Sequence, residues 1–196
     1  MVSLGEGKYG VKQAETKSGD RGVYVATFDK NGKRTLTGEK LGNSFTTHSF
    51  VDKNEKVVKD AIIDMNSTKA SDIVEDFKRN TPSTLNYLLN FKKYNLKGDN
   101  NSKQEKYEGS IMHNGEIGSM RDVGNYVAGY AFGKNGWPLR IARLGFERVE
   151  ATDNLTKLGN IFGNGTEGRS SVLAQNRGWL DGYKAQLSKR TGRNYD

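Results

Sequence analysis

The chain contains no cysteine, only two prolines and only two histidines in 196 residues. The absence of cysteine excludes disulfide bonds, thiolate zinc sites and a cysteine nucleophile. No stretch approaches the run of about 18 apolar residues that crosses a bilayer, so we expect no insertion into a membrane. The first ten residues, MVSLGEGKYG, have none of the apolar core that marks a secretory signal peptide. We therefore expect export to depend on a separate carrier.

Hydrophobic residues are scarce, at 34% of the chain, whereas glycine is abundant, with 24 residues. This composition predicts a modest core and many tight turns in one domain, or in one domain with a small appendage. Residues 1–20 are polar and rich in glycine, so we expect them to be poorly ordered. The formal net charge of +8 favours anionic partners, such as nucleic acid, anionic lipid, cell-wall polymers or an acidic inhibitor protein. A basic surface that only keeps the protein soluble would have the same charge.

A β-hairpin is predicted near the start of the chain. Residues 23–28 are β-branched and aromatic, and the dipeptide Asn31-Gly32 separates them from a second run at 34–37. Asn-Gly supplies the positive φ angles that a tight hairpin turn needs. Residues 44–51 are a candidate third strand.

Apolar residues at helical spacing predict helices in the rest of the first half. These helices cover residues 71–79 with Ser71 as the N-cap and residues 81–89 with Pro82 at the first helical position. In the second of them, Leu85 and Leu88 are expected to face the core. Residues 56–66 are ambiguous, although their apolar residues also have helical spacing. A polar loop at 95–106 then separates a first part, residues 1–106, from a second part, residues 107–196.

The second part is predicted to be mainly helical. Its expected elements are a hairpin around Asn114-Gly115, a helix from Ser119 to about Gly133, an arginine-rich helix at 139–149, a glycine-rich loop at 159–168 and a terminal helix at 169–190. The terminal helix is expected to bury Val172, Leu173, Trp179, Leu180, Tyr183 and Leu187. Strands first and helices later indicate an α+β fold, in which an N-terminal hairpin or small antiparallel sheet precedes a mainly helical half.

The candidate catalytic residues lie where the second hairpin leads into a helix. They are His113, Glu116, Arg121 and Asp122. Imidazole titrates near neutrality and suits general acid–base catalysis. Glu116 or Asp122 can orient the imidazole or act as its partner, and Arg121 can hold an anionic group through two parallel hydrogen bonds.

Ordinary structural roles also account for these residues. Asp122 suits the positive end of the helix dipole, Asn125 suits a buried hydrogen-bonding position, and His113 suits a turn. Asn125 lies three residues after Asp122 and shares its helix face. Glycine and alanine at four-residue spacing, as in Gly129 and Gly133, allow a second helix to come very close.

Other candidate sites are weaker. His113 and Glu116 form one possible pair of metal ligands, and Asp60 and Asp64, four residues apart, form another. Solvated helix charges explain the two aspartates better. We expect no metal and no other cofactor. Arg140 and Arg143, together with Lys134, are a candidate surface for binding an anionic substrate.

Three segments carry a resemblance to a known family. They are MRDVGNYVAGYAFGKNGW, RIARLGFERVEA and EGRSSVLAQNRGWLDGYK. Over roughly residues 107–190 the chain resembles the polymorphic toxin type 44 family of bacteria, in which a helix with a Gly-Asn pair is followed by a second helix and a glutamine-containing terminal helix. Matched to that pattern, the resemblance points to Gly124, Asn125, Gly129, Gln175 and Gly178 as site residues.

The resemblance implies a secreted effector domain that acts inside another bacterial cell, in the cytoplasm or the periplasm. It also implies a carrier belonging to a secretion apparatus and a cognate immunity protein, and domains of this family are predicted RNases. Together with the charge, these expectations favour a metal-independent nuclease with a His–carboxylate pair and an arginine clamp. The alternatives are a peptidoglycan hydrolase that uses carboxylates for acid–base chemistry, and a binding module without enzymatic activity.

Overall fold

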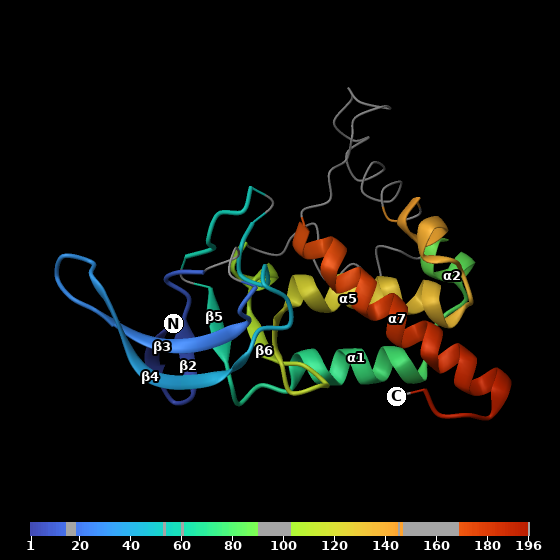
Figure 1. Ribbon diagram of the computed structural model, residues 1–196, viewed down its shortest axis with the longest axis horizontal. Helices are drawn as coiled ribbons and strands as arrows, with labels where there is room; N and C mark the ends of the chain where they lie inside the picture. Colours follow the sequence, from blue (N-terminus) through green and yellow to red (C-terminus); the bar gives the residue numbers. More distant parts are fainter. Residues whose placement is uncertain are drawn as a thin grey trace, which may run out of the picture.

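The computed structural model describes residues 1–14, 19–52, 54–59, 61–89, 103–144, 146 and 169–195. It confirms the α+β fold: strands lie at one end of the molecule and helices at the other (Figure 1). In chain order the elements are β1 (Val2–Gly5), β2 (Lys8–Gly10), β3 (Gly22–Phe28), β4 (Arg34–Asn43), β5 (Ile62–Asp64), α1 (Lys69–Arg79), α2 (Thr84–Leu89), α4 (Lys103–Lys106), β6 (Gly109–Ile111), β7 (Ile117–Ser119), α5 (Met120–Lys134) and α7 (Arg169–Thr191). Predictions for residues 147–168, Asp60 and most of the 95–106 loop lie outside the described residues.

The first strands belong to a five-stranded sheet with the order β1-β2-β5-β6-β7. Neighbours in this sheet are antiparallel, except that β5 and β6 run parallel. The expectation of disorder in residues 1–20 was therefore wrong for β1 and β2. Gly5, Glu6 and Gly7 have φ angles of 87°, 51° and 74°, and this left-handed turn brings the two short strands together.

The predicted hairpin at 23–37 is confirmed as a separate two-stranded sheet of β3 and β4. Asp29 closes its turn: the carboxylate accepts hydrogen bonds of 2.8 Å from the backbone N–H groups of Asn31 and Lys33. The hairpin extends away from the helices in Figure 1. Residues 44–51, expected as a third strand, form turns instead. There the side chains of Thr46 and Ser49 bind backbone N–H groups and so compete with strand pairing.

The ambiguous segment 56–66 does not form the helix that its apolar spacing suggested, because Ile62–Asp64 form strand β5 between β2 and β6. Ile63 is fully buried in the sheet while Ile62 is 44% exposed, which is the two-residue alternation of a strand. Val57 and Val58 lie outside it, and Val57 takes part only in an isolated bridge. The apolar residues here have helical spacing, but pairing with distant strands makes the segment a strand.

The next two helices form, but with different ends. Helix α1 begins at Lys69 after Thr68, so Ser71 lies inside the helix and is not its N-cap. Helix α2 begins at Thr84, two residues after Pro82. Its predicted apolar face is also wrong, because Leu85 and Leu88 are 66% and 38% exposed, whereas Tyr87 between them is 2% exposed.

The second hairpin and the helix after it are confirmed. Gly115 has a φ of 77° in the turn between β6 and β7, and Ser119 caps α5. The Ser119 hydroxyl accepts the backbone N–H of Asp122, and the Asp122 carboxylate accepts the backbone N–H of Ser119 at 2.9 Å. This capping box sets where α5 begins, and α5 is buried on every side from Met120 to Gly133.

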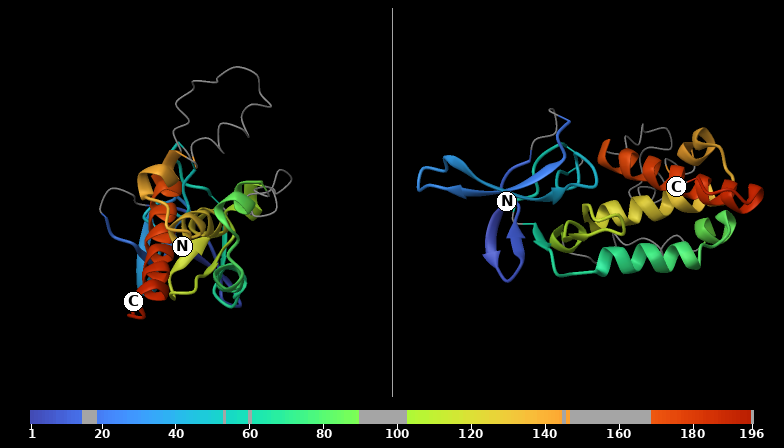
Figure 2. Two further views of the ribbon diagram at one scale, coloured as in Figure 1. Left: turned by 90° about the vertical axis from the view of Figure 1, so that its right-hand side faces the viewer. Right: turned by 60° about the horizontal axis from the view of Figure 1, so that its bottom comes forward.

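Helix α5 lies between α1 and α7 (Figures 1 and 2). The α5–α7 crossing brings the two backbones into contact, as the spacing of Gly129 and Gly133 predicted. A Cβ atom added at Gly129 would lie 2.0 Å from the carbonyl oxygen of Gln175, and one added at Gly178 would lie 2.0 Å from that of Tyr126. Gly133 and Gly182 are equally tight, at 2.1 and 2.4 Å. Each helix therefore needs glycine at both positions.

Of the apolar set predicted for α7, Trp179 packs against the helical core, but the set as a whole is not buried. Leu180 is 48% exposed, and Val172, Leu173, Tyr183 and Leu187 are only partly buried. The buried positions of α7 carry small or polar residues, namely Ser171, Ala174, Gln175, Gly178 and Gly182. A terminal helix that packs through backbone contact has no wide apolar stripe.

Two hydrophobic clusters stabilise the fold. One joins α1, α2, α5 and α7, and it includes Phe45 from the turn after β4. The other lies in the sheet around Val11, Ile63 and Ile117. Residues from both sides of the 106/107 boundary contribute to each cluster, and β5 pairs with β6 across that boundary. The two predicted parts thus share one sheet and one helical core.

We predict that Gly178→Ala destabilises the protein by about 2 kcal/mol or more, because the new methyl group meets the α5 backbone rather than a movable side chain. The slight gain in helix propensity offsets only about 1 kcal/mol. Urea unfolding followed by circular dichroism measures the change. Leu180→Ala, on the exposed side of the same helix, is the control and should change stability by less than about 0.5 kcal/mol. Equal stability of Gly178→Ala and the wild type would contradict the close crossing.

Candidate functional site

His113 lies in the turn between β6 and β7, where the hairpin meets α5 and α7. Two backbone hydrogen bonds of 2.8 Å close the turn, from Met112 to Glu116 and from Gly115 to Met112. The imidazole packs against the Tyr126 ring, with 5.0 Å between the centroids. The hairpin sequence therefore presents His113 to the middle of α5.

Tyr126 links His113 to a carboxylate on α7. Its hydroxyl donates a 2.7 Å hydrogen bond to Asp181 Oδ2 and lies 3.3 Å from His113 Nε2. Because the single Tyr126 proton is directed to Asp181, His113 must donate from Nε2, which leaves Nδ1 without a proton. Nδ1 is shielded from solvent and has no hydrogen-bond partner among the described residues.

The surroundings of His113 favour its neutral form. Burial is the main cause, and with the nearby Lys78 and Arg177 charges it outweighs Asp181 and lowers the pKa of His113 to about 4. Burial and the Asp181 carboxylate raise the pKa of the Tyr126 hydroxyl, so Tyr126 stays a hydrogen-bond donor. An anion bound beside His113 would shift its pKa upward again.

Glu116, in the same turn, is held by two arginines. Its Oε2 accepts a 2.6 Å hydrogen bond from Arg177 on α7, and its Oε1 pairs with Arg21, which precedes β3. Burial alone would raise the pKa of Glu116, but hydrogen bonds and charge from Arg177, with bonds from Asn114 and Arg21, hold the pKa below its usual value. Glu116 is therefore an ionised carboxylate near neutral pH.

Aromatic rings connect these two groups of residues. The Arg177 guanidinium lies 4.1 Å from the centre of the Phe45 ring, and Phe45 meets Tyr126 edge-on at 5.7 Å. Lys78 of α1 lies 5.6 Å from the Tyr126 ring. We call the set His113, Glu116, Tyr126, Asp181, Arg21 and Arg177 the His113 cluster. Arg21 and Arg177 are 39% and 37% exposed at their side chains, so they are the part of the cluster that an anionic ligand can reach.

Arg121, predicted as the phosphate clamp, lies away from this cluster. It is 4% exposed, and its guanidinium donates to the carbonyl oxygens of His48, at 2.6 Å, and Val51. It also stacks on the Tyr107 ring, 4.9 Å from its centre. These contacts anchor the 44–51 turns to α5. Burial keeps the rest of the guanidinium, including the Nε that has no partner in the described ranges, away from a phosphate in solution.

Asp122, the other predicted partner of His113, has a capping role. Its Oδ2 accepts from the backbone and hydroxyl of Ser119, at 2.9 and 2.8 Å, and the residue is fully buried. Its Oδ1 has no partner among the described residues. These contacts therefore favour a structural role for Asp122 at the start of the helix over a catalytic role.

The residues indicated by the family resemblance come together in a second place. Asn125 donates a 3.0 Å hydrogen bond to Ser171 and accepts one of 3.4 Å from Gln175, whose side-chain oxygen accepts from Arg143 at 3.1 Å. Gly129 lies against the Gln175 carbonyl, and Gly124 is buried in α5. This buried network ties α7 to α5 and to the helical residues 139–144.

The predicted basic face of Lys134, Arg140 and Arg143 does not form a common surface. Lys134 donates to the Lys78 carbonyl at 2.6 Å and to Thr81, and Arg143 is bound to Gln175. Of these three residues, only Arg140 is exposed, whereas Lys134 and Arg143 are half-buried.

Comparison with protein-family models, with curated proteins and with solved structures finds no match for this chain. The toxin-family resemblance therefore stays a prediction, and the site is judged on its geometry. Within the described ranges, no helix is long and apolar enough to cross a membrane. In the same ranges, no three His, Asp or Glu side chains are grouped as metal ligands.

Sequence reasoning found His113 and Glu116 but missed Tyr126, Asp181, Arg177 and Arg21 as their partners. Arg177 and Asp181 each precede one of the glycines, Gly178 and Gly182, that touch α5. The four-residue glycine spacing on α7 was the available signal, because neighbours of a contact glycine lie at the edge of the helix interface. Arg21 had no such signal, since only the tertiary fold brings it to Glu116.

We predict opposite changes in the pKa of His113 when its charged neighbours are removed. Lys78→Gln removes a positive charge and should raise the pKa from about 4, whereas Asp181→Asn removes a negative charge and should lower it. Burial, the largest cause, remains in both variants. NMR titration of the imidazole measures the values, with Lys69→Gln, an exposed lysine paired with Glu108, as the control. A His113 that titrates near 6.5 in the wild type would contradict the buried arrangement.

Proposed function

We propose that this chain is a toxic effector domain that cleaves RNA without a metal, with the His113 cluster as its active site. The observation that carries the proposal is Glu116, an ionised carboxylate held between two partly exposed arginines in the same turn as His113. A base, a candidate acid and two guanidinium groups in one place match what phosphodiester cleavage needs.

In the proposed reaction, a phosphate of the RNA binds Arg21 and Arg177, which stabilise the negative charge that develops at phosphorus. Glu116, released from part of its pairing, accepts the proton of the 2′-hydroxyl. The 2′-oxygen then attacks phosphorus, and the bond from phosphorus to the 5′-oxygen breaks. His113, protonated because the bound phosphate raises its pKa, donates a proton to that leaving oxygen. The products are a 2′,3′-cyclic phosphate and a 5′-hydroxyl.

Tyr126 and Asp181 position the imidazole in this scheme. Asp181 holds the Tyr126 hydroxyl, which accepts from His113 Nε2 and fixes the tautomer. Nδ1 is shielded, so proton transfer from it requires a movement of the 112–116 turn when substrate binds. Asn114 and Gly115 at the tip of that turn are exposed, which leaves room for it.

The peptidoglycan hydrolase alternative has less support from this geometry. A glycosidase needs a carboxylic acid that keeps its proton near neutral pH. Although burial favours the protonated form of Glu116, Arg177 and Arg21 hold its pKa below the usual value, and Asp122 is committed to the helix cap. An immunity protein, a secretion carrier and action inside a target cell belong to the proposal through the family resemblance alone.

We predict that purified protein cleaves an RNA oligonucleotide, and that Glu116→Gln and His113→Gln each lower kcat by roughly 100-fold or more. Replacement of the 2′-hydroxyl by hydrogen at the scissile nucleotide should stop cleavage, and mass spectrometry should show the cyclic phosphate. Glu108→Gln, an exposed carboxylate paired with Lys69, is the matched control and should keep wild-type activity. Full activity of Glu116→Gln, or equal cleavage of DNA, would contradict the proposal.

A further inference from the structure

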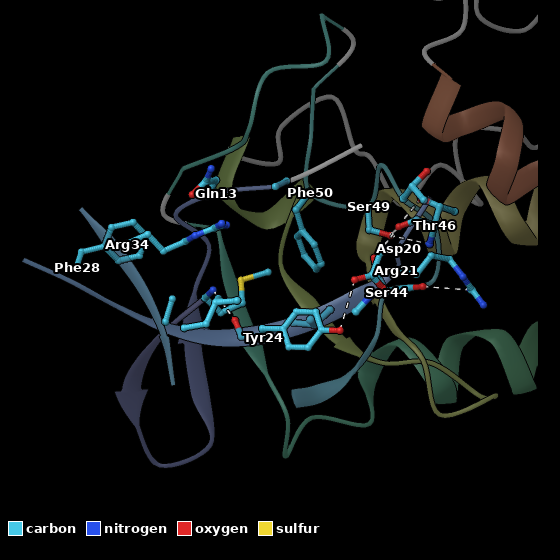
Figure 3. Close-up of a pocket in the computed structure, with 17 residues that line it drawn as sticks. Gln13, Asp20, Arg21, Tyr24, Phe28, Arg34, Ser44, Thr46, Ser49 and Phe50 are labelled. Carbon is cyan, nitrogen blue, oxygen red and sulfur yellow. Dashed lines mark hydrogen bonds between the residues drawn. The ribbon is translucent and has the colours of Figure 1, made fainter. Parts of the chain in front are cut away.

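A cavity of about 260 Å³ lies beside the His113 cluster, between the β3–β4 hairpin and the turns at 44–50 (Figure 3). Its size is close to the lower end of small-molecule pockets, roughly 300 Å³, and suits one nucleoside. Arg21 lines the cavity and also pairs with Glu116. The cavity and the proposed active site therefore share Arg21 as a neighbour.

The lining of the cavity places cations at its two ends and rings between them. In Figure 3, Arg34 lies at one end and Arg21 at the other, with Tyr24 and Phe50 between. Phe28 lies beside Arg34, because the two are paired across the β3–β4 hairpin. Arg34 is exposed and forms no ion pair within the described part of the chain.

Among the described residues that line the cavity, Asp20 is the acidic one, and its neighbours orient it. Asp20 accepts a 2.8 Å hydrogen bond from the backbone N–H of Gly22 and one of 3.4 Å from the Tyr24 hydroxyl. A carboxylate repels a phosphate but accepts hydrogen bonds from the N–H groups of a nucleobase. In Figure 3, Asp20 lies at the Arg21 end of the cavity. The lining thus suits a base that stacks on Tyr24 and Phe50 and donates to Asp20, with phosphates at the two arginines.

We propose that this cavity is a subsite for single-stranded RNA that holds the nucleoside attached to the scissile phosphate. Aromatic faces between cationic side chains are how proteins track single strands without strict sequence preference. The inference rests on the proposed nuclease function: the scissile phosphate lies at Arg21 and Arg177, the next nucleoside fills the cavity, and Arg34 holds the phosphate beyond it.

The test measures binding of labelled 2′-O-methyl RNA by fluorescence anisotropy, because these oligomers cannot be cleaved through a 2′-hydroxyl. Wild-type protein should bind a tetranucleotide more tightly than a dinucleotide. Arg34→Ala should weaken tetranucleotide binding about tenfold, within the range of one lost contact, and leave dinucleotide binding within twofold. It should also reduce the dependence of log Kd on log salt by about 0.7.

Lys33→Ala is the matched control, since Lys33 is the exposed neighbour of Arg34 and does not line the cavity; it should bind like the wild type. Equal effects of both variants, or no effect of Arg34→Ala, would overturn the subsite. The proposed function is tested separately, by cleavage of an unmodified dinucleotide. If Arg34→Ala still cleaves RNA and binds the tetranucleotide as tightly as the wild type, the subsite is ruled out but the nuclease is not. If binding depends on Arg34 but no RNA is cleaved, the nuclease is ruled out but the subsite is not.

Discussion

Helices α5 and α7 touch backbone to backbone, and this contact lets Asp181 and Arg177 reach Tyr126 and Glu116. Gly129 and Gly133 on one helix meet Gly178 and Gly182 on the other, with no space for a single added carbon. At this separation the side chains that border the glycines reach across the crossing. Asp181 meets the Tyr126 hydroxyl, and Arg177 passes over Phe45 to Glu116. A looser crossing would separate the carboxylate, the phenol and the guanidinium from the hairpin that carries His113.

The surroundings of His113 and of Glu116 favour different charge states in the two halves of the cluster. Around His113, burial and the neighbouring cations keep the imidazole neutral in the free protein, so its protonation is coupled to the arrival of an anion. Around Glu116, two arginines outweigh the effect of burial and keep the carboxylate ionised. The basic charge of the whole chain, +8, favours a polyanionic partner, and in the proposed function the partly exposed Arg21 and Arg177 bind its phosphate.

Local signals in the sequence were sufficient where a single turn or cap decides the structure. Asn31-Gly32 and Asn114-Gly115 predicted two hairpins, and Ser119 predicted the start of α5. Prediction failed where contacts between distant segments determine the structure. Strand β5 forms between β2 and β6 despite a helical pattern. Helix α7 packs mainly through small residues and not through its predicted apolar set. The prediction of the site residues was incomplete for the same reason. Arg121 serves the fold, and the proposed phosphate contact falls instead to Arg21, ninety-five positions before Glu116.

The most direct test of the account is growth of a bacterium that expresses this chain either in the cytoplasm or in the periplasm, with RNA integrity followed on gels. An RNA-cleaving effector should arrest growth and degrade RNA only from the cytoplasm. Cell rounding and lysis only from the periplasm, with intact RNA, would contradict the account and favour a cell-wall substrate. Normal growth from both compartments would contradict the toxin function itself.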